Sequence, residues 1–326
     1  MDKLQELGVA MIVRNAGATV ERAIRSVLSV AQQIVVVDTG SQDKTASICS
    51  RLGCEIYFKK WTDDFSEARN HALNFMRTDW ILSLDADEEL DVDSFLKNKF
   101  FLNNENAGGI KVKIVNLLEQ DKPDYQTVHT YSRLFRNNQE IRFEGRIHEQ
   151  ISDSIISTGL EIIDSDIIIR HYGYIQTGQE KIDRNRELLE KELQSKPEDV
   201  WYNYHLAETE FAAGDKDKAK ALFESIVNST ELSLEQRENV FIKLAQIALN
   251  KDDFDGLDKW LNFKSENVNN EGFRKFILAT ALMLLKRFSE AKVLLESPEV
   301  GQSGLVDTKS LQKAHEVINI VLKPGK

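Results

Sequence analysis

The sequence is poor in cysteine and proline, with two cysteines and four prolines among its 326 residues. Cys49 and Cys54 cannot form a disulfide framework, and no C-x-x-C motif occurs, so we expect no redox role. We interpret them as reduced, partly buried thiols of a cytoplasmic protein. The scarcity of proline, with 29% charged and 41% hydrophobic residues, is typical of a soluble globular protein with substantial helix.

Long hydrophobic runs are also missing. No run of about 18 apolar residues occurs, so we expect no integral membrane segment. The N-terminal stretch MDKLQELGVAMIVRN lacks a basic segment followed by a long apolar one, so we expect no signal peptide. Acidic residues outnumber basic residues by 53 to 42, and the resulting formal net charge of -11 argues against a general nucleic-acid binder. A local pocket can still bind an anion, because local charge can oppose net charge.

The chain length predicts two domains. Between residues 8 and 110, short apolar runs alternate with helical patterns. The predicted strands cover residues 9–13, 33–38, 55–60 and 80–85, and the predicted helices cover 19–30, 43–53 and 64–76. This alternation predicts a parallel sheet covered by helices on both faces. Strand-like pieces at 108–117, 130–137, 141–151 and 165–174 predict a mixed or antiparallel extension of the same domain.

After Gly178 the pattern is helical throughout. A charged amphipathic helix ends before Pro197, and an internal repeat follows at spacings of 38 and 34 residues. Its equivalent positions are Ala207, Ala219 and Phe223, then Ala245, Leu257 and Leu261, then Ala279, Ala291 and Leu295. Small residues at helix contacts resemble the tetratricopeptide helix pair, and an ordinary helical bundle is the alternative. The predicted segments are 1–178, a connecting helix at 179–196, and a helical domain at 197–326.

Five Asp-x-Asp pairs occur, so the motif alone identifies no site. In an open α/β sheet, ligands bind outside the carboxyl ends of the strands, and position therefore sorts the pairs. Only Asp85 and Asp87 follow a buried-type strand. Asp91/Asp93 is interpreted as capping the next helix, and Asp164/Asp166 as preceding a strand. Asp215/Asp217 and Asp253/Asp255 are interpreted as turn and capping residues between the repeat helices.

Three predicted strands deliver polar groups to one edge, ending in Asn15, Asp38 and the pair Asp85/Asp87. Two carboxylates so close raise each other's pKa unless a cation neutralises them. Mg²⁺ or Mn²⁺ takes oxygen ligands and completes its shell with substrate phosphates. This edge is therefore a candidate metal and phosphate site. The acids that follow, Glu88 and Glu89, are interpreted as the start of a solvated turn.

Several stretches resemble, in order and spacing, the family 2 glycosyltransferases of the GT-A fold. They are MIVRNAGATVERAIRSV, IVVVDTGSQDKT, WTDDFSEARNHAL, WILSLDADEEL and FEGRIHEQI. With HYGY and the tetratricopeptide-like tail, the pattern is most similar to the branch of sublancin-type peptide glycosyltransferases. The resemblance covers residues 8–178 strongly and the tail loosely. It implies an α/β, Rossmann-like nucleotide-sugar domain followed by an all-α helical domain.

The resemblance also implies roles in donor binding. Asp38 would contact the nucleotide base, and Arg69 and Asn70 would line the nucleotide pocket together with Asn15. Two alternatives stay open, since Arg69 fits a solvated helix charge and Asn15 fits a turn residue. Ala16 departs from the family pattern, where an acid is often found.

The metal and catalytic roles are implied in the same way. Asp85 would lie beside the ribose and the metal, Asp87 would be the direct metal ligand, and His171 would reach the metal or the diphosphate. An inverting transferase needs a base for the acceptor proton, for which Glu149 is the first candidate and His148 the second. Structural hydrogen bonding is the alternative for both histidines and for Glu149.

The expected function is inverting, metal-dependent transfer from a UDP-sugar, such as UDP-glucose, to a peptide or protein side chain. The helical tail would hold that acceptor or a second copy of the chain in a homodimer. One rival is the same chemistry on a lipopolysaccharide or cell-wall glycan. The other is a decayed scaffold whose repeats bind protein partners. The sequence does not give the acceptor, the sugar or the oligomeric state.

Overall fold

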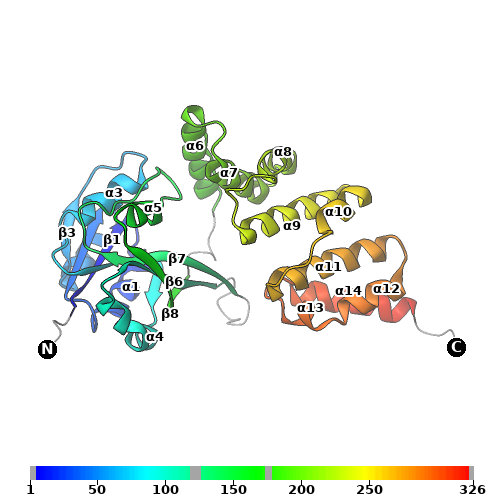
Figure 1. The fold of residues 1–326 in the computed structure, drawn as a ribbon, viewed down its shortest axis with the longest axis horizontal. Helices are drawn as coiled ribbons and strands as arrows, with labels where there is room; N and C mark the ends of the chain where they lie inside the picture. Colours follow the sequence, from blue (N-terminus) through cyan, green and yellow to red (C-terminus); the bar gives the residue numbers. More distant parts are fainter. Residues whose placement is uncertain (1–4, 118–125, 173–177, 323–326) are drawn as a thin grey trace. The chain divides into compact units, whose positions relative to one another are not determined.

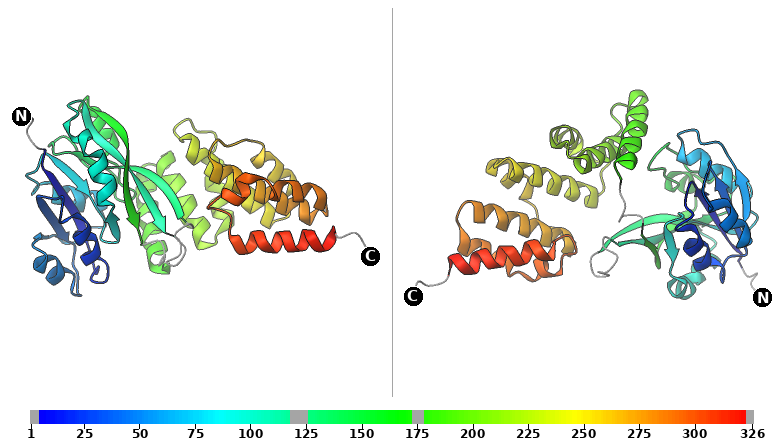
Figure 2. Two further views of the ribbon diagram at one scale, coloured as in Figure 1. Left: turned by 90° about the horizontal axis from the view of Figure 1, so that it is seen from below. Right: turned by 180° about the vertical axis from the view of Figure 1, so that it is seen from behind.

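The computed structural model describes residues 5–117, 126–172 and 178–322. Its contacts divide the chain into two compact units, Met1–Thr177 and Gly178–Lys326. The first unit contains the strands, and the second is built from helices (Figure 1). In both views of Figure 2 the strands form one continuous twisted sheet.

Eight strands of the described residues form this sheet, in the order β3-β2-β1-β4-β7-β6-β8-β5. The strands are β1 (Leu7–Val13), β2 (Gln33–Asp38), β3 (Glu55–Phe58), β4 (Trp80–Ser83), β5 (Glu88–Leu90), β6 (Ala107–Leu117), β7 (Gln126–Arg136) and β8 (Glu161–His171). Strands β3, β2, β1 and β4 are parallel. Strand β7 runs antiparallel to β4 and β6, β8 is parallel to β6, and β5 is antiparallel to β8.

Helices cover both faces of the sheet. One face packs against α1 (Val20–Val27), α2 (Thr45–Arg51), α4 (Val92–Asn98) and the 3₁₀ helix η1 (Lys99–Asn103). The other packs against α3 (Phe65–Leu73) and α5 (Ser152–Ser157). All six residues of β2 are buried, as expected for a parallel strand covered on two sides. The predicted parallel sheet, its covering helices and its mixed extension are confirmed.

Two predictions for the extension are wrong. Residues 141–151 form a loop with one isolated bridge, between Glu144 and Gln150, and not a strand. Gly145 and His148 have φ angles of 96° and 53°, which extended strands do not allow. The second error concerns Asp164 and Asp166, which lie inside β8 and not before a strand.

The second unit consists of paired helices. Its elements are α6 (Gln179–Ser195), α7 (Val200–Ala213), α8 (Lys216–Ile226), α9 (Leu234–Asn250), α10 (Phe254–Leu261), α11 (Val268–Leu284), α12 (Phe288–Leu295), α13 (Pro298–Gln302) and α14 (Thr308–Val321). The three predicted repeats are the pairs α7/α8, α9/α10 and α11/α12. All nine repeat positions are at most 4% exposed, so the equivalent residues form the contacts within and between pairs.

Each repeat turns at a residue with left-handed backbone. These residues are Gly214, Asp252 and Lys286, with φ angles of 91°, 53° and 61°, and they follow one another at the repeat spacing. Asp215 and Asp253 then cap α8 and α10 by accepting backbone hydrogen bonds of 3.0 and 2.9 Å. The predicted capping role of these two aspartates is confirmed.

No helix among the described residues combines the length and the apolar composition that a membrane span requires. Both cysteines are free thiols, and Cys49 is buried. Burial raises the pKa of Cys49 to about 11 and that of Cys54 to about 12. Neither cysteine therefore supplies a reactive thiolate at neutral pH.

Candidate active site

The carboxyl ends of three adjacent parallel strands form the edge where the sequence places polar side chains. The register pairs Val13 of β1 with Asp38 of β2, and Ala10 of β1 with Ser83 of β4. Asn15, Asp38 and the Asp85–Asp87 stretch therefore lie beyond or at the ends of neighbouring strands on one side of the sheet. The prediction that three strand ends converge on one edge is confirmed.

Asn15 and Asp38 shape the loops at this edge. Asp38 is 2% exposed, and its Oδ1 accepts hydrogen bonds from the backbone of Gly40 (2.9 Å) and Ser41 (2.7 Å). Asn15 has a φ of 51°, and its Oδ1 accepts from the backbone of Gln42 at 2.8 Å. Asn15 is thus a turn residue that joins the loop after β1 to the loop after β2. Both hydrogen bonds from Gly40 and Ser41 use Oδ1 of Asp38.

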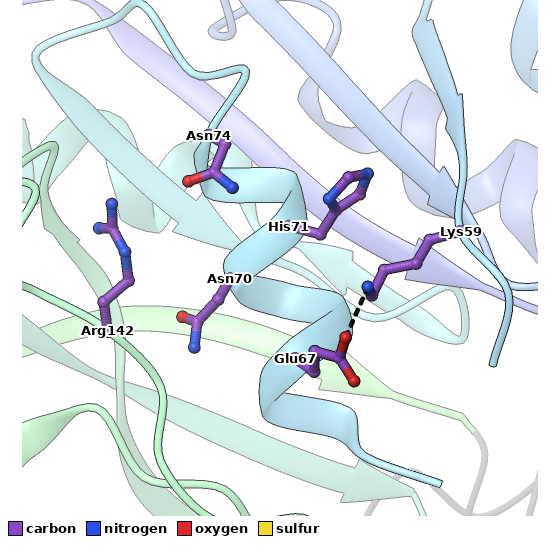
Figure 3. Close-up of a pocket in the computed structure, with 6 residues that line it drawn as sticks. All are labelled: Lys59, Glu67, Asn70, His71, Asn74 and Arg142. Atoms are coloured by element: carbon purple, nitrogen blue, oxygen red, sulfur yellow. Dashed lines mark hydrogen bonds and ion pairs between the residues drawn. The ribbon is translucent and has the colours of Figure 1, made fainter. Parts of the chain in front are cut away.

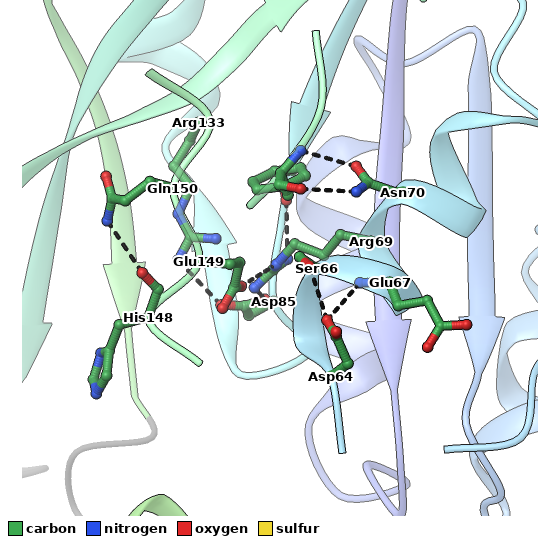
Figure 4. A network of polar contacts seen from close by, with 12 residues as sticks. Asp64, Ser66, Glu67, Arg69, Asn70, Asp85, Arg133, His148, Glu149 and Gln150 are labelled. Carbon is green, nitrogen blue, oxygen red and sulfur yellow. Dashed lines mark hydrogen bonds and ion pairs between the residues drawn. The ribbon is translucent and has the colours of Figure 1, made fainter. Parts of the chain in front are cut away.

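Arg69 is the centre of a buried network (Figure 4). It lies on α3 and is 7% exposed. Its Nε donates to Oε1 of Glu149 at 2.5 Å, its Nη1 donates to Oγ of Ser83 at 3.0 Å, and its Nη2 donates to Oδ1 of Asp85 at 2.8 Å. The alternative interpretation of Arg69 as a solvated helix charge is therefore wrong.

Asp85 is held by two arginines. Its Oδ1 accepts from Arg69, and its Oδ2 accepts from Nη2 of Arg133 on β7 at 3.1 Å. Burial alone would raise the pKa of Asp85, but the two guanidinium groups outweigh burial and hold it well below its usual value. Both oxygens are thus fixed by guanidinium groups, and each keeps a lone pair for a further partner, so the role of Asp85 beside the metal stays a prediction.

Glu88 belongs to the same network, and the expectation of a solvated turn there is wrong. The residue is 2% exposed because β5 pairs with β8. Its Oε2 accepts from the backbone nitrogen of Asp85 at 2.9 Å, and its Oε1 accepts from Arg133 at 3.2 Å. Burial raises the pKa of Glu88, and the Asp85 charge adds to the rise while Arg133 opposes it. Arg133 and Glu88 were both missed from the sequence.

Asp87 and His171 face each other outside this network. Nε2 of His171 lies 3.3 Å from Oδ2 of Asp87. Its Nδ1 lies 2.7 Å from Oδ1 of Asn116, a contact that favours the tautomer with the proton on Nδ1. Burial lowers the pKa of His171, but the hydrogen bond and charge of Asp87 outweigh burial and raise it. Asn116, on β6, is a third residue that the sequence did not reveal.

This pair fits a hard divalent cation. Among the described residues, no three His, Cys, Asp or Glu side chains gather as a complete metal site. Mg²⁺ does not need one, because it commonly binds one or two protein groups together with waters and substrate phosphates. The Asp87 side chain is 35% exposed, and a proton on Nδ1 leaves Nε2 of neutral His171 as the coordinating nitrogen.

The loop at 141–151 carries Glu149 and is docked on α3. Asn70 donates to the carbonyl of Phe143 at 2.8 Å and accepts from its backbone nitrogen at 2.9 Å. The backbone nitrogen of Phe65 donates to the carbonyl of Arg146 at 2.8 Å. Asn70 therefore fastens the Glu149 loop, and its amide is occupied by the backbone of that loop.

Glu149 and His148 point in different directions. In Figure 4 the carboxylate of Glu149 points toward Arg69, whereas the ring of His148 points away from Arg69 and Asp85. The Glu149 side chain is 12% exposed. Its Oε2 accepts no hydrogen bond from the described part of the chain, so one oxygen stays available to a substrate proton.

An open groove of about 400 Å³ lies along α3 (Figure 3). It is lined by Lys59, Glu67, Asn70, His71, Asn74 and Arg142. Lys59 donates to Glu67 at 2.7 Å, which partly neutralises the groove. Neither Asp85 nor Asp87 lines it, so the groove is separate from the edge described above.

Comparison with known proteins finds a family that most of the first unit matches. Residues 8–168 match the family described as Glycosyl transferase family 2. A TPR repeat-containing protein of Synechococcus elongatus is 33% identical over 210 residues, which cover 61% of this chain and 50% of that protein. The SPbeta prophage-derived glycosyltransferase SunS of Bacillus subtilis is 27% identical over 291 residues, which cover 82% of this chain and 65% of SunS.

Solved structures give a weaker likeness. TarS of S. aureus in complex with UDP-GlcNAc is 13% identical, with 91% of this chain and 92% of that chain covered and a TM-score of 0.42. The chain spans half the length of the cyanobacterial relative and 65% of SunS, so the activities of whole relatives do not transfer to it directly.

Proposed function

We propose that the protein transfers a sugar from a nucleotide-sugar donor to an acceptor, because residues 8–168 match glycosyltransferase family 2. The observation that supports this most is the Asp87–His171 pair, whose facing atoms lie 3.3 Å apart. The pair stands at the carboxyl edge of the parallel strands, beside the buried Arg69–Asp85 network. An α/β sheet binds its ligands at that edge.

Asp87 and His171 would hold Mg²⁺ or Mn²⁺ together with the donor's diphosphate. When bound, the metal would neutralise the charge that develops on the leaving diphosphate. Asp85 has a different role in this proposal. Its carboxylate is fixed by Arg69 and Arg133, so it would present a rigid oxygen acceptor toward the ribose. Asp38 and Asn15 would bound the nucleotide pocket from the neighbouring loops.

Glu149 would act as the base of an inverting transfer. Its Oε1 is fixed by Arg69, and its other oxygen would accept the proton of the acceptor nucleophile as that nucleophile attacks. Arg69 thereby links the base to the donor-side carboxylate Asp85 through one planar guanidinium. His148 is the second candidate for the base. Its backbone is left-handed, and its ring points away from Arg69, which is why it ranks after Glu149.

The proposed donor is a UDP-sugar such as UDP-glucose, and the proposed acceptor is a peptide or protein side chain. Paired short helices form concave surfaces that suit extended peptides, which supports the acceptor class. A lipopolysaccharide or cell-wall glycan acceptor is the alternative with the same chemistry. Homodimerisation through the helical unit is the alternative use of the repeats.

Calorimetry tests the donor site directly. UDP should bind more tightly with Mn²⁺ than without it, and Asp87→Ala should remove the metal-dependent part of the affinity while leaving the fold intact. Absence of any metal-dependent UDP binding by the wild-type protein would overturn the proposed site. It would favour a decayed domain whose repeats act as a scaffold.

Mass spectrometry tests the acceptor class. Peptides rich in Cys, Ser or Thr are incubated with a panel of nucleotide sugars, beside oligosaccharide acceptors. Addition of a hexose mass to a peptide, absent with Asp87→Ala, supports the peptide acceptor. Addition to the oligosaccharides alone would replace it by the glycan alternative.

A further inference from the structure

We propose that Glu88 is a positioning residue that holds Asp87 in place for the divalent cation. The inference rests on the proposed function of the Asp87–His171 pair. The charge of the Glu88 carboxylate contributes to the raised pKa of His171. The positioning role rests on geometry, namely on the backbone and on the turn that Glu88 closes.

The first observation is a closed turn from Asp85 to Glu88. The backbone nitrogen of Glu88 donates to the carbonyl of Asp85 at 3.0 Å. In return, the backbone nitrogen of Asp85 donates to Oε2 of Glu88 at 2.9 Å. These two bonds link both ends of the turn, so Ala86 and Asp87 lie at its tip. The carboxylate of Glu88 therefore helps to hold the turn from which the Asp87 side chain projects.

The second observation is the pairing of β5 with β8. Glu88 is the register partner of His171 across the two strands. The next residue along, Tyr172, donates its backbone nitrogen to the carbonyl of Asp87 at 3.0 Å. The pairing of β5 with β8 thus fixes the position of His171 relative to the turn, and the Tyr172 hydrogen bond fixes the backbone of Asp87. Both members of the pair depend on the position of Glu88.

The third observation is the charge environment. The Glu88 carboxylate is 2% exposed, and Arg133 donates to both Glu88 (3.2 Å) and Asp85 (3.1 Å). Burying the Glu88 carboxylate beside Asp85 costs free energy, and an apolar residue of similar size would pack there without that cost. An apolar residue cannot accept the Asp85 N–H, however. The buried carboxylate therefore supplies a hydrogen-bond acceptor that the turn requires.

The experiment measures Mn²⁺ affinity in the presence of UDP, by electron paramagnetic resonance of free Mn²⁺. Glu88→Ala should weaken Mn²⁺ binding about 10- to 100-fold, the usual effect of removing a group that orients a metal ligand. Glu88→Gln retains an oxygen acceptor for the Asp85 N–H and should restore most of the affinity. Glu89→Ala is the matched control, because Glu89 is its neighbour and accepts from the Tyr172 hydroxyl at 2.8 Å.

The outcomes separate this inference from the proposed function. Wild type that binds no Mn²⁺ with UDP overturns the proposed function itself. A second outcome is that wild type binds Mn²⁺, Asp87→Ala does not, and folded Glu88→Ala binds Mn²⁺ as tightly as wild type. This outcome overturns only the role of Glu88. Circular dichroism checks folding. If Glu88→Ala fails to fold, Glu88→Gln decides: retained Mn²⁺ affinity supports the hydrogen-bond role, and a loss as large as that of Asp87→Ala contradicts it.

Discussion

Each unit of the protein contains an acid held by two cations, part-buried in the sheet unit and buried in the helical unit. In the sheet unit, Asp85 lies between Arg69 and Arg133, at 2.8 and 3.1 Å. In the helical unit, Glu210 is 1% exposed and lies between Arg186 and Lys218, at 2.8 and 2.7 Å. In both cases burial would raise the pKa of the acid, and the cations outweigh burial and lower it.

The two clusters differ in what surrounds them. The Glu210 cluster joins α6, α7 and α8, and it ends in exposed acids such as Asp183. The Asp85 cluster stands at the carboxyl ends of parallel strands and continues into two further acids, Glu88 and Glu149. A buried ion pair is therefore not by itself the mark of a site. What distinguishes the Asp85 cluster is its place at the sheet edge, beside the partly exposed Asp87–His171 pair that we propose as metal ligands.

Matched removal of one arginine from each cluster should give the largest contrast. Arg69→Met leaves Asp85 and Glu149 without their shared partner, and we expect a loss of about 3–5 kcal/mol in the free energy of unfolding. Arg186→Met leaves Glu210 with Lys218, and we expect a loss of about 1–3 kcal/mol. Urea denaturation measures both. Turnover per folded molecule should vanish only with Arg69→Met, and its loss with Arg186→Met would contradict the division between the clusters.

Replacing the proposed base should affect rate more than stability. Glu149→Gln keeps the shape of the side chain and removes its ability to accept a full proton. We expect sugar transfer about 10²- to 10⁴-fold slower than wild type, with UDP affinity retained. His148→Ala is the control. A large loss with His148→Ala and none with Glu149→Gln would exchange their roles.

The pH dependence of stability tests the helical cluster. The pKa of folded Glu210 lies below its ordinary value of 4.5, so its stabilisation is complete above that value and is lost as pH falls through the folded pKa. Stability of the wild type should therefore fall more steeply than that of Glu210→Gln as the solution is acidified below about pH 5. Parallel thermal melting curves across this range provide the measurement, and equal slopes would contradict the role of Glu210.

The smallest effect is expected at the surface of β8. Asp166 pairs with Lys113 at 2.5 Å, but their side chains are 80% and 43% exposed. Solvent screens such a pair, so Asp166→Asn should leave the melting temperature within about 2 °C of wild type. A larger drop would mean that exposed cross-strand pairs contribute more to this sheet than the buried networks suggest.

The sequence predicted the parts of the fold that repeat a strong pattern. The four parallel strands carry continuous apolar runs, and the helix pairs carry the same small and large residues at each turn. The loop at 141–151 was missed because alternating residues can also face a helix from an irregular backbone. Glu88 was misread because a three-residue strand is too short to show any period.

The candidate site divides in the same way. Asp85 and Asp87 were predicted because they follow a strand, and Arg69, Glu149 and His171 entered through the family resemblance. Arg133 and Asn116 were missed, since their partners Asp85 and His171 lie 48 and 55 residues away in the chain. Pairing of β7 and β6 decides those contacts, and no local spacing encodes it. Asn70 was predicted as a nucleotide contact, whereas its amide is bonded to the backbone of Phe143.

The left-handed turns at Gly214, Asp252 and Lys286 also bear on how the helical unit loses its structure. Repetition of one turn makes the unit a short linear array, in which each helix pair contacts mainly the next. Stability in such an array is close to a sum of pair terms and nearest-neighbour terms. Opening should then start at an end and spread one pair at a time. Amide hydrogens should accordingly show protection that is graded along the array, in contrast to the shared protection of the sheet.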